Sequence, residues 1–157
     1  SIELDISSYP GINIRGGIGF NGQLIAQYFF SPSVGAYAGL GVVGRKMTLN
    51  SSANPLFLDI PFGLAFQYRS NPTMRNTIGI GLFYAQPLGD FPDTGGTEPL
   101  QGVLGLDLQL NTYFHVSEAF ELGFGSTFRF GFSSVFAAYS SPLLLGIDIG
   151  VSGRIHL

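Results

Sequence analysis

The stretch LLLGIDIGVSGRIHL, residues 143–157, decides the fold of this chain. From Leu145 onward every odd position is apolar apart from one glycine, and every even position is glycine, serine, histidine or charged. Side chains on a strand alternate between two faces, so this pattern predicts one extended strand with an apolar face and a polar face. On a soluble sheet, Lys and Glu would crowd the polar face. Their absence here favours a polar interior and an apolar face turned toward lipid.

The composition of the whole chain supports a lipid environment. Charged residues make up 11% and hydrophobic residues 45%, and the mean hydropathy of +0.32 is high for a protein bathed in water. No window of about 18 uninterrupted apolar residues is present, which excludes a membrane-spanning helix and leaves a closed barrel. The 157 residues suit a single domain, residues 1–157, of about eight strands with turns.

Several classes of function are disfavoured by composition. The chain has no cysteine, which removes disulfides, thiol catalysis and thiolate metal sites. Its net charge is −3 with a single lysine, Lys46, so there is no basic patch for nucleic acid. It starts at Ser1 without a basic segment and an apolar run, so we expect that any signal peptide has been removed or was never included.

Alternating apolar residues predict eight strands, and polar or proline-containing segments predict the connections between them. The facing of residues 34–49 stays open because apolar residues occupy both faces there. A turn is expected at Tyr9-Pro10-Gly11, after the first strand. The expected strands are 2–8, 16–30, 34–49, 56–69, 77–87, 101–114, 120–132 and 143–157, with turns at 31–33, 70–76 and 115–118 and loops at 50–55, 88–99 and 133–142.

Shorter turns at one rim and longer loops at the other are typical of outer-membrane barrels. The chain is therefore predicted to be an eight-stranded antiparallel up-and-down transmembrane β-barrel, in contact with lipid of the cell outer membrane. Both termini are expected at the short-turn, periplasmic rim. Aromatic residues near strand ends are expected to form an interfacial girdle: Tyr28, Phe30, Phe66, Tyr68, Tyr113 and Phe114. A soluble antiparallel sandwich, with the apolar face as its core, is the alternative.

The predicted polar faces carry four acids and three arginines but no lysine. Arginine is preferred for buried, hydrogen-bonded ion pairs, and an unpaired charge is costly to bury. Eight strands leave an interior just wide enough for side chains to fill, so we expect no pore and interpret the glycines as room for large neighbours. The expected structural ion-pair network consists of Asp59, Arg69, Asp107, Glu121, Arg129, Asp148 and Arg154.

Three segments resemble a known family: GFNGQLIAQYFFSPSVGAYAGLGV (19–42), FLDIPFGLAFQYRS (57–70) and TIGIGLFYAQPLG (77–89). They are similar to the small PorT-like outer-membrane barrels of Bacteroidota, in which a short Asn/Ser-Pro turn and a glycine-rich strand precede a strand like Phe57-Leu58-Asp59-Ile60-Pro61. The resemblance implies the same fold and membrane. One departure is the last residue, Leu157, where outer-membrane strands usually end in an aromatic residue.

Residues that could carry chemistry are few. Some eight-stranded outer-membrane barrels modify lipid A with a histidine and a serine or acid near the outer leaflet, but His115 and His156 are expected at the opposite rim. Asp90, Asp93 and Glu98 could bind a divalent cation, although their spacing matches no calcium loop and a solvated acidic loop is expected.

We therefore expect no enzymatic activity, no catalytic residue, no bound metal and no cofactor. The leading hypothesis is an accessory or scaffold subunit of a larger outer-membrane complex, with another outer-membrane protein as its partner. A lipid A- or phospholipid-modifying barrel enzyme and a small-ligand or surface-recognition barrel are the alternatives.

Overall fold

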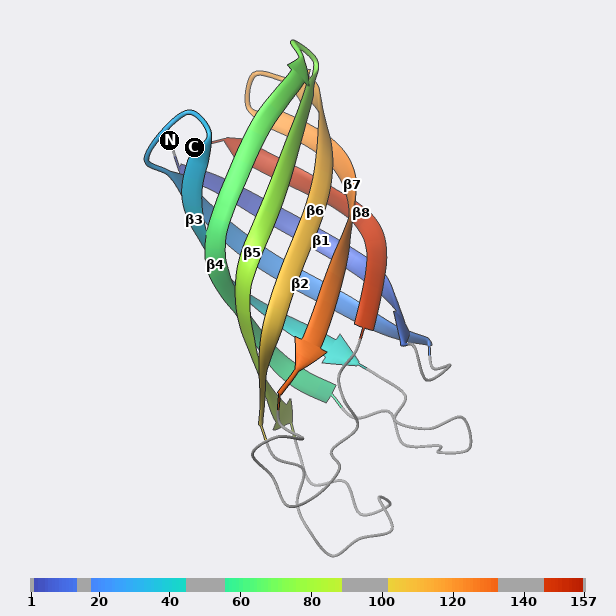
Figure 1. The fold of residues 1–157 in the computed structure, drawn as a ribbon. Coiled ribbons are helices and arrows are strands. Elements are labelled where there is room, and N and C mark those ends of the chain that lie inside the picture. The colour runs from blue at the N-terminus through green and yellow to red at the C-terminus, as the bar shows by residue number, and fades with distance from the viewer. Residues whose placement is uncertain (1, 14–17, 45–55, 89–101, 133–145, 157) are drawn as a thin grey trace, which may run out of the picture.

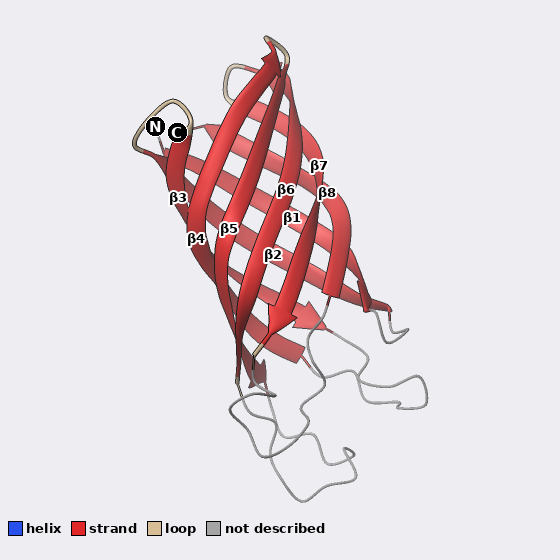
Figure 2. Cartoon of the chain, viewed as in Figure 1, coloured by secondary structure: helices blue, strands red, loops and turns tan. Residues whose placement is uncertain are grey.

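The computed structural model describes residues 2–13, 18–44, 56–88, 102–132 and 146–156. They form strands, and no helix among them is long and apolar enough to cross a membrane (Figure 2). The strands are β1 (Ile2–Asn13), β2 (Ile18–Phe29), β3 (Val34–Gly44), β4 (Leu56–Asn71), β5 (Met74–Leu88), β6 (Val103–Ser117), β7 (Phe120–Gly131) and β8 (Gly146–His156) (Figure 1).

Each strand pairs antiparallel with its neighbours in the chain, and β1 also pairs with β8, which closes the sheet into a barrel. In this seam Glu3 lies opposite His156, and Ile12 lies opposite Ile147. The predicted all-β, antiparallel up-and-down arrangement is confirmed. Closure pairs the backbone groups of the wall with one another, which is what hydrocarbon demands of a membrane-spanning sheet.

The two ends of the barrel differ in their connections. At the turn end, residues 30–33, 72–73 and 118–119 join the strands, and the start of β1 and the end of β8 lie there too (Figure 1). At the loop end, the connections run from 13 to 18, from 44 to 56, from 88 to 103 and from 131 to 146, and all but the first are longer than those at the turn end. The loops expected at 50–55, 88–99 and 133–142 lie outside the described residues, apart from Leu88, which ends β5.

The turn expected at Tyr9-Pro10-Gly11 is wrong, because β1 continues through it to Asn13. Between the pairs Ser8–Val151 and Gly11–Asp148, the ladder to β8 has no pair at Tyr9 or Pro10. A proline cannot donate to a ladder, and this interruption accommodates it without ending the strand.

The turns expected at 70–76 and 115–118 are also wrong in length. β4 continues to Asn71 and β5 begins at Met74, while β6 continues to Ser117. In both hairpins the register shifts near the tip, between Arg69 and Asn71 and between His115 and Ser117. Polar residues, which predict a turn in sequence, are tolerated in a strand where it projects beyond the apolar part of the wall.

Side chains alternate strictly between the two faces of the wall. Between the barrel ends, odd-numbered residues point inward in β3 to β7 and from Asn21 in β2, whereas even-numbered residues point inward in β8. In β3, whose facing the sequence left open, Tyr37 and Val43 are buried while Leu40 and Val42 are exposed. Residues 45–49 of that predicted strand lie outside the described residues.

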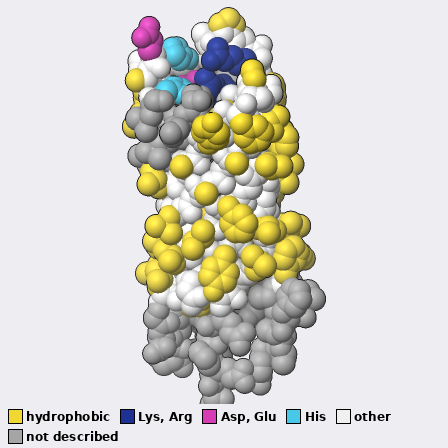
Figure 3. All heavy atoms as spheres, turned by 90° about the vertical axis from the view of Figure 1, so that its left-hand side faces the viewer, with side chains coloured by type: hydrophobic (Ala, Val, Ile, Leu, Met, Phe, Trp, Pro, Cys, Tyr) yellow, Lys and Arg dark blue, Asp and Glu magenta, His cyan; other side chains and the backbone are white. Residues whose placement is uncertain are grey.

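Large apolar side chains cover the outer wall, and the charged and histidine side chains visible in Figure 3 gather at the turn end. Exposed Leu, Ile and Phe residues lie along the middle of the strands, for example Leu106, Ile80 and Phe124. Of the residues expected in an aromatic girdle, Tyr28, Phe30, Phe66, Tyr68 and Phe114 are exposed near the turn end of β2, β4 and β6. Tyr113 is wrong, because its side chain points inward and is buried. This apolar band faces lipid.

Glycines inside the barrel make room for buried tyrosine rings, as expected. A Cβ atom added to Gly79 would lie 3.2 Å from Cε1 of Tyr37, and one added to Gly123 would lie 2.7 Å from Cδ1 of Tyr113. Tyr37 is on β3 and Gly79 is on β5, so this ring reaches past β4 to cover the glycine. Both tyrosines are buried.

Candidate functional site

Two clusters of polar side chains lie in the described interior. The Arg129 cluster is nearer the loop end and the Glu121 cluster is nearer the turn end. The Arg129 cluster comprises Gln23, Tyr37, Asp59, Asp107, Gln109 and Arg129. The Glu121 cluster comprises Gln27, Gln67, Arg75, Thr77, Tyr113, Glu121, Arg154 and His156.

Arg129 on β7 links two carboxylates on different strands. Its NH1 lies 2.8 Å from Oδ2 of Asp59, and its Nε donates to Oδ1 of Asp107 at 2.9 Å. Arg129 and Asp107 are directly opposite in the β6–β7 ladder, so register alone brings them together. The guanidinium also lies 5.1 Å from the centre of the Phe83 ring, within the range of a cation–π contact.

Uncharged donors complete the Arg129 cluster. The Tyr37 hydroxyl donates to Oδ2 of Asp107 at 2.9 Å, and Nε2 of Gln109 donates to the same oxygen at 2.7 Å. Nε2 of Gln23 donates to Oδ2 of Asp59. Gly41 pairs with Gln23 on one side and with Asp59 on the other, and the glycine leaves Gln23 free to reach across it.

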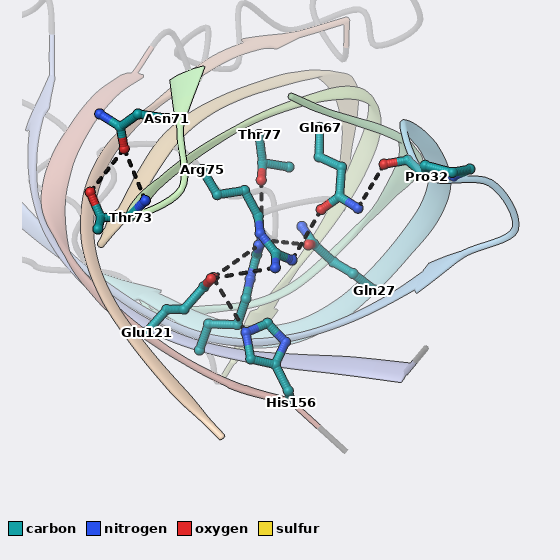
Figure 4. A network of polar contacts seen from close by, with 10 residues as sticks. Gln27, Pro32, Gln67, Asn71, Thr73, Arg75, Thr77, Glu121 and His156 are labelled. Carbon is teal, nitrogen blue, oxygen red and sulfur yellow. Dashed lines mark hydrogen bonds and ion pairs between the residues drawn. The ribbon is translucent and has the colours of Figure 1, made fainter. Parts of the chain in front are cut away.

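In the Glu121 cluster, three basic side chains surround one carboxylate (Figure 4). Glu121 lies 3.4 Å from NH2 of Arg75, 3.7 Å from NH1 of Arg154 and 3.5 Å from Nε2 of His156. The side chain of Arg154 is fully buried, whereas that of His156 is 20% exposed. The cluster is therefore reached from the turn end.

Neutral side chains tie the Glu121 cluster to the wall. NH2 of Arg154 donates to Oε1 of Gln27 at 2.6 Å and to Oγ1 of Thr77 at 3.2 Å, and its guanidinium lies 3.9 Å from the centre of the Tyr113 ring.

Arg75 donates to Oε1 of Gln67 at 3.2 Å, and Nε2 of Gln67 donates to the carbonyl oxygen of Pro32 at 3.1 Å. The cluster thus reaches the β2–β3 turn.

Apolar side chains share the interior with the polar ones, which the expectation of a polar interior did not include. One group packs near the loop end and consists of Phe57, Phe83, Ala85 and Val103. A second consists of Ile25, Phe29, Tyr37 and Ala65. In each predicted strand the face with more apolar residues was taken as the outer face. The fewer apolar residues on the inner face were therefore not predicted.

Six of the seven residues predicted for the interior network are buried: Asp59, Asp107, Glu121, Arg129, Asp148 and Arg154. Arg69 is exposed instead, which corrects its assignment. The last pair between β3 and β4 is Val34–Phe66, so Arg69 lies beyond the end of β3, where β4 no longer borders an enclosed space.

Arg75 was missed, although its inward side chain is only 8% exposed. Its odd position matches that of Thr77, the next inward residue of β5, and this parity could have revealed it. Because a turn was expected at 70–76, Arg75 was not assigned to a strand and its parity was not considered.

Both histidines lie at the turn end. His115, in the last part of β6, is exposed, and His156 contacts Glu121. The acids Asp90, Asp93 and Glu98 lie outside the described residues. Within the described part of the chain, no group of three or more His, Cys, Asp or Glu side chains could hold a metal ion.

Comparison with known proteins reveals similarity in structure. No family model matches the chain, and no curated protein matches it. The fold is similar to Neisserial surface protein A (NspA), with a TM-score of 0.67 and 12% identity over 99% of this chain and 96% of that one. It is similar to the outer membrane enzyme PagL, with a TM-score of 0.60 and 12% identity over 98% and 99% of the two chains. It is also similar to the Yersinia pestis outer membrane protein Ail, with a TM-score of 0.52 and 13% identity over 99% of this chain and 100% of that one.

The barrel topology, the apolar outer band and this likeness define the class: the chain is a small outer-membrane β-barrel protein. Its location is the outer membrane.

Proposed function

We propose that this protein is a non-enzymatic, PorT-like barrel of Bacteroidota that serves as an accessory or scaffold subunit of a larger outer-membrane complex. The observation that carries the proposal is the use of the interior charges: Arg129 is held between Asp59 and Asp107, and Glu121 is held among basic side chains. These groups brace the wall from within. The outer wall, the rims and the loops then provide the working surfaces.

The burial of the interior groups also argues against catalysis on lipid. A catalytic acid or base must come within hydrogen-bonding reach of its substrate. Between the barrel ends, no described residue on the outward face is charged, and the charged residues of the Arg129 cluster are buried behind the paired strands. A lipid lying against the wall therefore meets no such group.

A lipid-modifying enzyme is the second candidate, and one observation favours it. Nε2 of His156 lies 3.5 Å from Glu121, and a histidine oriented by a carboxylate is a common general base. The pair lies at the turn end, so it could act only on molecules reaching that side of the membrane.

The decisive experiment compares a deletion strain with strains complemented by the wild type or by the double variant His115→Ala/His156→Ala. We expect mass spectrometry to find the same lipid A and phospholipids in all of them. We also expect the barrel, extracted from native membranes in mild detergent, to migrate in a complex larger than the barrel alone. His115→Ala by itself is the matched control, because the His115 side chain is exposed, whereas Nε2 of His156 lies 3.5 Å from the Glu121 carboxylate.

Two results would contradict the proposal. A lipid that changes by an acyl chain in the deletion strain, and is restored by the wild type but not by the double variant, would establish an enzyme. A barrel that migrates alone in every mild detergent would remove the subunit role.

A further inference from the structure

One carboxylate oxygen of the Arg129 cluster has no partner. Oδ1 of Asp107 accepts from Arg129, and its Oδ2 accepts from Tyr37 and Gln109. Oδ2 of Asp59 is contacted by Arg129 and Gln23, but Oδ1 of Asp59 has no hydrogen-bond partner, although the residue is 0% exposed. A buried polar atom without a partner is uncommon in folded proteins and points to a bound water or ion.

A second unpartnered oxygen is held next to the first. Nε2 of Gln23 donates to Asp59, so the amide group of Gln23 is fixed against this carboxylate. Oε1 of the same amide has no hydrogen-bond partner, and Gln23 is 4% exposed. Both atoms are hydrogen-bond acceptors and cannot satisfy one another.

Further buried oxygens lie along the same part of the wall. Ser152 pairs with Ser7 and Ser7 pairs with Gln23, so strand register places Ser152 and Gln23 in one row. Asn21 lies two residues before Gln23 on the same face of β2. The Ser152 hydroxyl and both polar atoms of the Asn21 amide are buried without a hydrogen-bond partner. The row therefore offers carboxylate, amide and hydroxyl oxygens.

The charge of the cluster distinguishes a cation from a water molecule. Asp59 and Asp107 carry two negative charges against the single positive charge of Arg129. Asp148 is also buried near Arg129, opposite Thr127 in the β7–β8 ladder, so the surplus of negative charge is at least one. A net charge is costly to bury in a barrel surrounded by lipid. A water molecule would satisfy the oxygens but leave that charge. A proton on Asp59 would remove the charge, and a metal cation would both remove the charge and serve as a partner for the free oxygens.

The donor set also indicates the charge of the ion. Divalent cations are usually held by several carboxylates. Only Asp59 contributes an unpartnered carboxylate oxygen here, and the described residues contain no group of three or more acids or histidines suited to a metal. One unpartnered carboxylate oxygen suits a cation of single charge.

We propose that a monovalent metal cation, Na⁺ or K⁺, binds inside the barrel between Oδ1 of Asp59 and Oε1 of Gln23, with Asn21 and Ser152 as further oxygen donors. The ion neutralises the Arg129 cluster and stabilises the folded barrel. The inference is independent of the proposed accessory role, because it concerns only the interior.

The test measures the thermal unfolding midpoint of the full chain, folded in an uncharged detergent, in NaCl, KCl and N-methyl-D-glucamine chloride at equal ionic strength. Equal ionic strength removes general screening as a cause. We expect a higher midpoint in NaCl or KCl than with the bulky organic cation, rising with metal concentration as expected for a ligand of the folded state alone. Crystals soaked in thallium(I), a heavy substitute for K⁺, should show an anomalous peak beside Asp59.

A matched pair of variants locates the site. Gln23→Leu and Gln109→Leu each remove a buried amide that donates to an aspartate of the cluster, but only Gln23 carries the unpartnered oxygen. Gln23→Leu should lose the difference between the salts, and Gln109→Leu should keep it. Asp59→Asn should also lose it, and Gln23→Leu keeps the test decisive if that variant does not fold. Equal midpoints in the three salts, indicating water or a proton at the site, or a difference that survives Gln23→Leu, would overturn the proposal.

Discussion

Arg129 shows how much of the interior can be predicted at the level of single residues. The absence of lysine and the inward parity of this position predicted a buried arginine among acids, and the structure places Asp59 and Asp107 beside it. Its uncharged neighbours could not be predicted. Tyr37 comes from β3, whose facing was ambiguous in sequence, and Gln23 reaches Asp59 only because a glycine lies between them.

We predict that Arg129→Leu destabilises the barrel by about 3–5 kcal/mol, because it leaves buried carboxylates without their cation. The measurement is the unfolding midpoint, read from the shift in gel mobility between the folded and the heat-unfolded barrel.

Arg69→Leu is the control for Arg129→Leu, since Arg69 is exposed beyond the end of β3. Its effect should stay within about 0.5 kcal/mol, as is usual for surface positions. Equal midpoints for the two variants would mean that the Arg129 cluster is open to water.

Among the elements, strands with clean alternation were predictable and strand ends were not. β6 carries leucine at every outward position from Leu104 to Leu110, that is, at every second residue, and its facing follows directly from the sequence. The end of β1 could not be predicted, because Pro10 normally indicates a turn. Here the ladder to β8 is interrupted at that point and the strand continues. The β4–β5 hairpin was shortened in the prediction because its tip is polar.

We predict that Gly123→Val destabilises the β6–β7 wall by about 1–3 kcal/mol, a typical effect of overpacking. A Cβ atom at this position would lie 2.4 Å from the Thr112 carbonyl oxygen and 2.7 Å from the Tyr113 ring, which stacks on Arg154. Urea unfolding followed by tyrosine fluorescence measures the loss.

Gly22→Val is the matched control for Gly123→Val, because Gly22 is exposed on the outer face and a Cβ atom there would meet nothing within 4 Å. It should unfold at the wild-type urea concentration. If Gly22→Val lowered stability as much as Gly123→Val, the loss would reflect strand propensity and not the space beneath Tyr113.

For the molecule as a whole, the two ends determine which function is open to it. The Glu121 cluster, His115 and His156 all lie at the turn end, so the side of the membrane that this end faces decides which lipids and proteins they can meet. The distribution of connection lengths predicts that the turn end is periplasmic.

We predict that Thr94→Cys and Ser134→Cys react with a membrane-impermeant thiol reagent on intact cells, whereas Asn71→Cys does not. The chain has no cysteine of its own, so each variant has a single reactive site. Asn71 is exposed at the turn end, and its protection would therefore come from the membrane and not from burial in the protein.

Permeabilised cells are the control for the labelling, and all three variants should react there. Reaction of intact cells at position 71 alone would reverse the orientation. The His156–Glu121 pair would then face the outer leaflet, which would favour the enzyme over the subunit.

The seam between β1 and β8 constrains how the barrel can enter a membrane. It joins the first strand of the chain to the last, so β1 is delivered long before its second partner exists. Until then, β1 presents a row of unpaired N–H and C=O groups at one edge, which hydrocarbon does not tolerate. The strands therefore cannot insert into lipid one at a time. The early strands must be kept out of contact with the hydrocarbon until β8 is available. The barrel wall enters the bilayer only when β8 pairs with β1 and closes it.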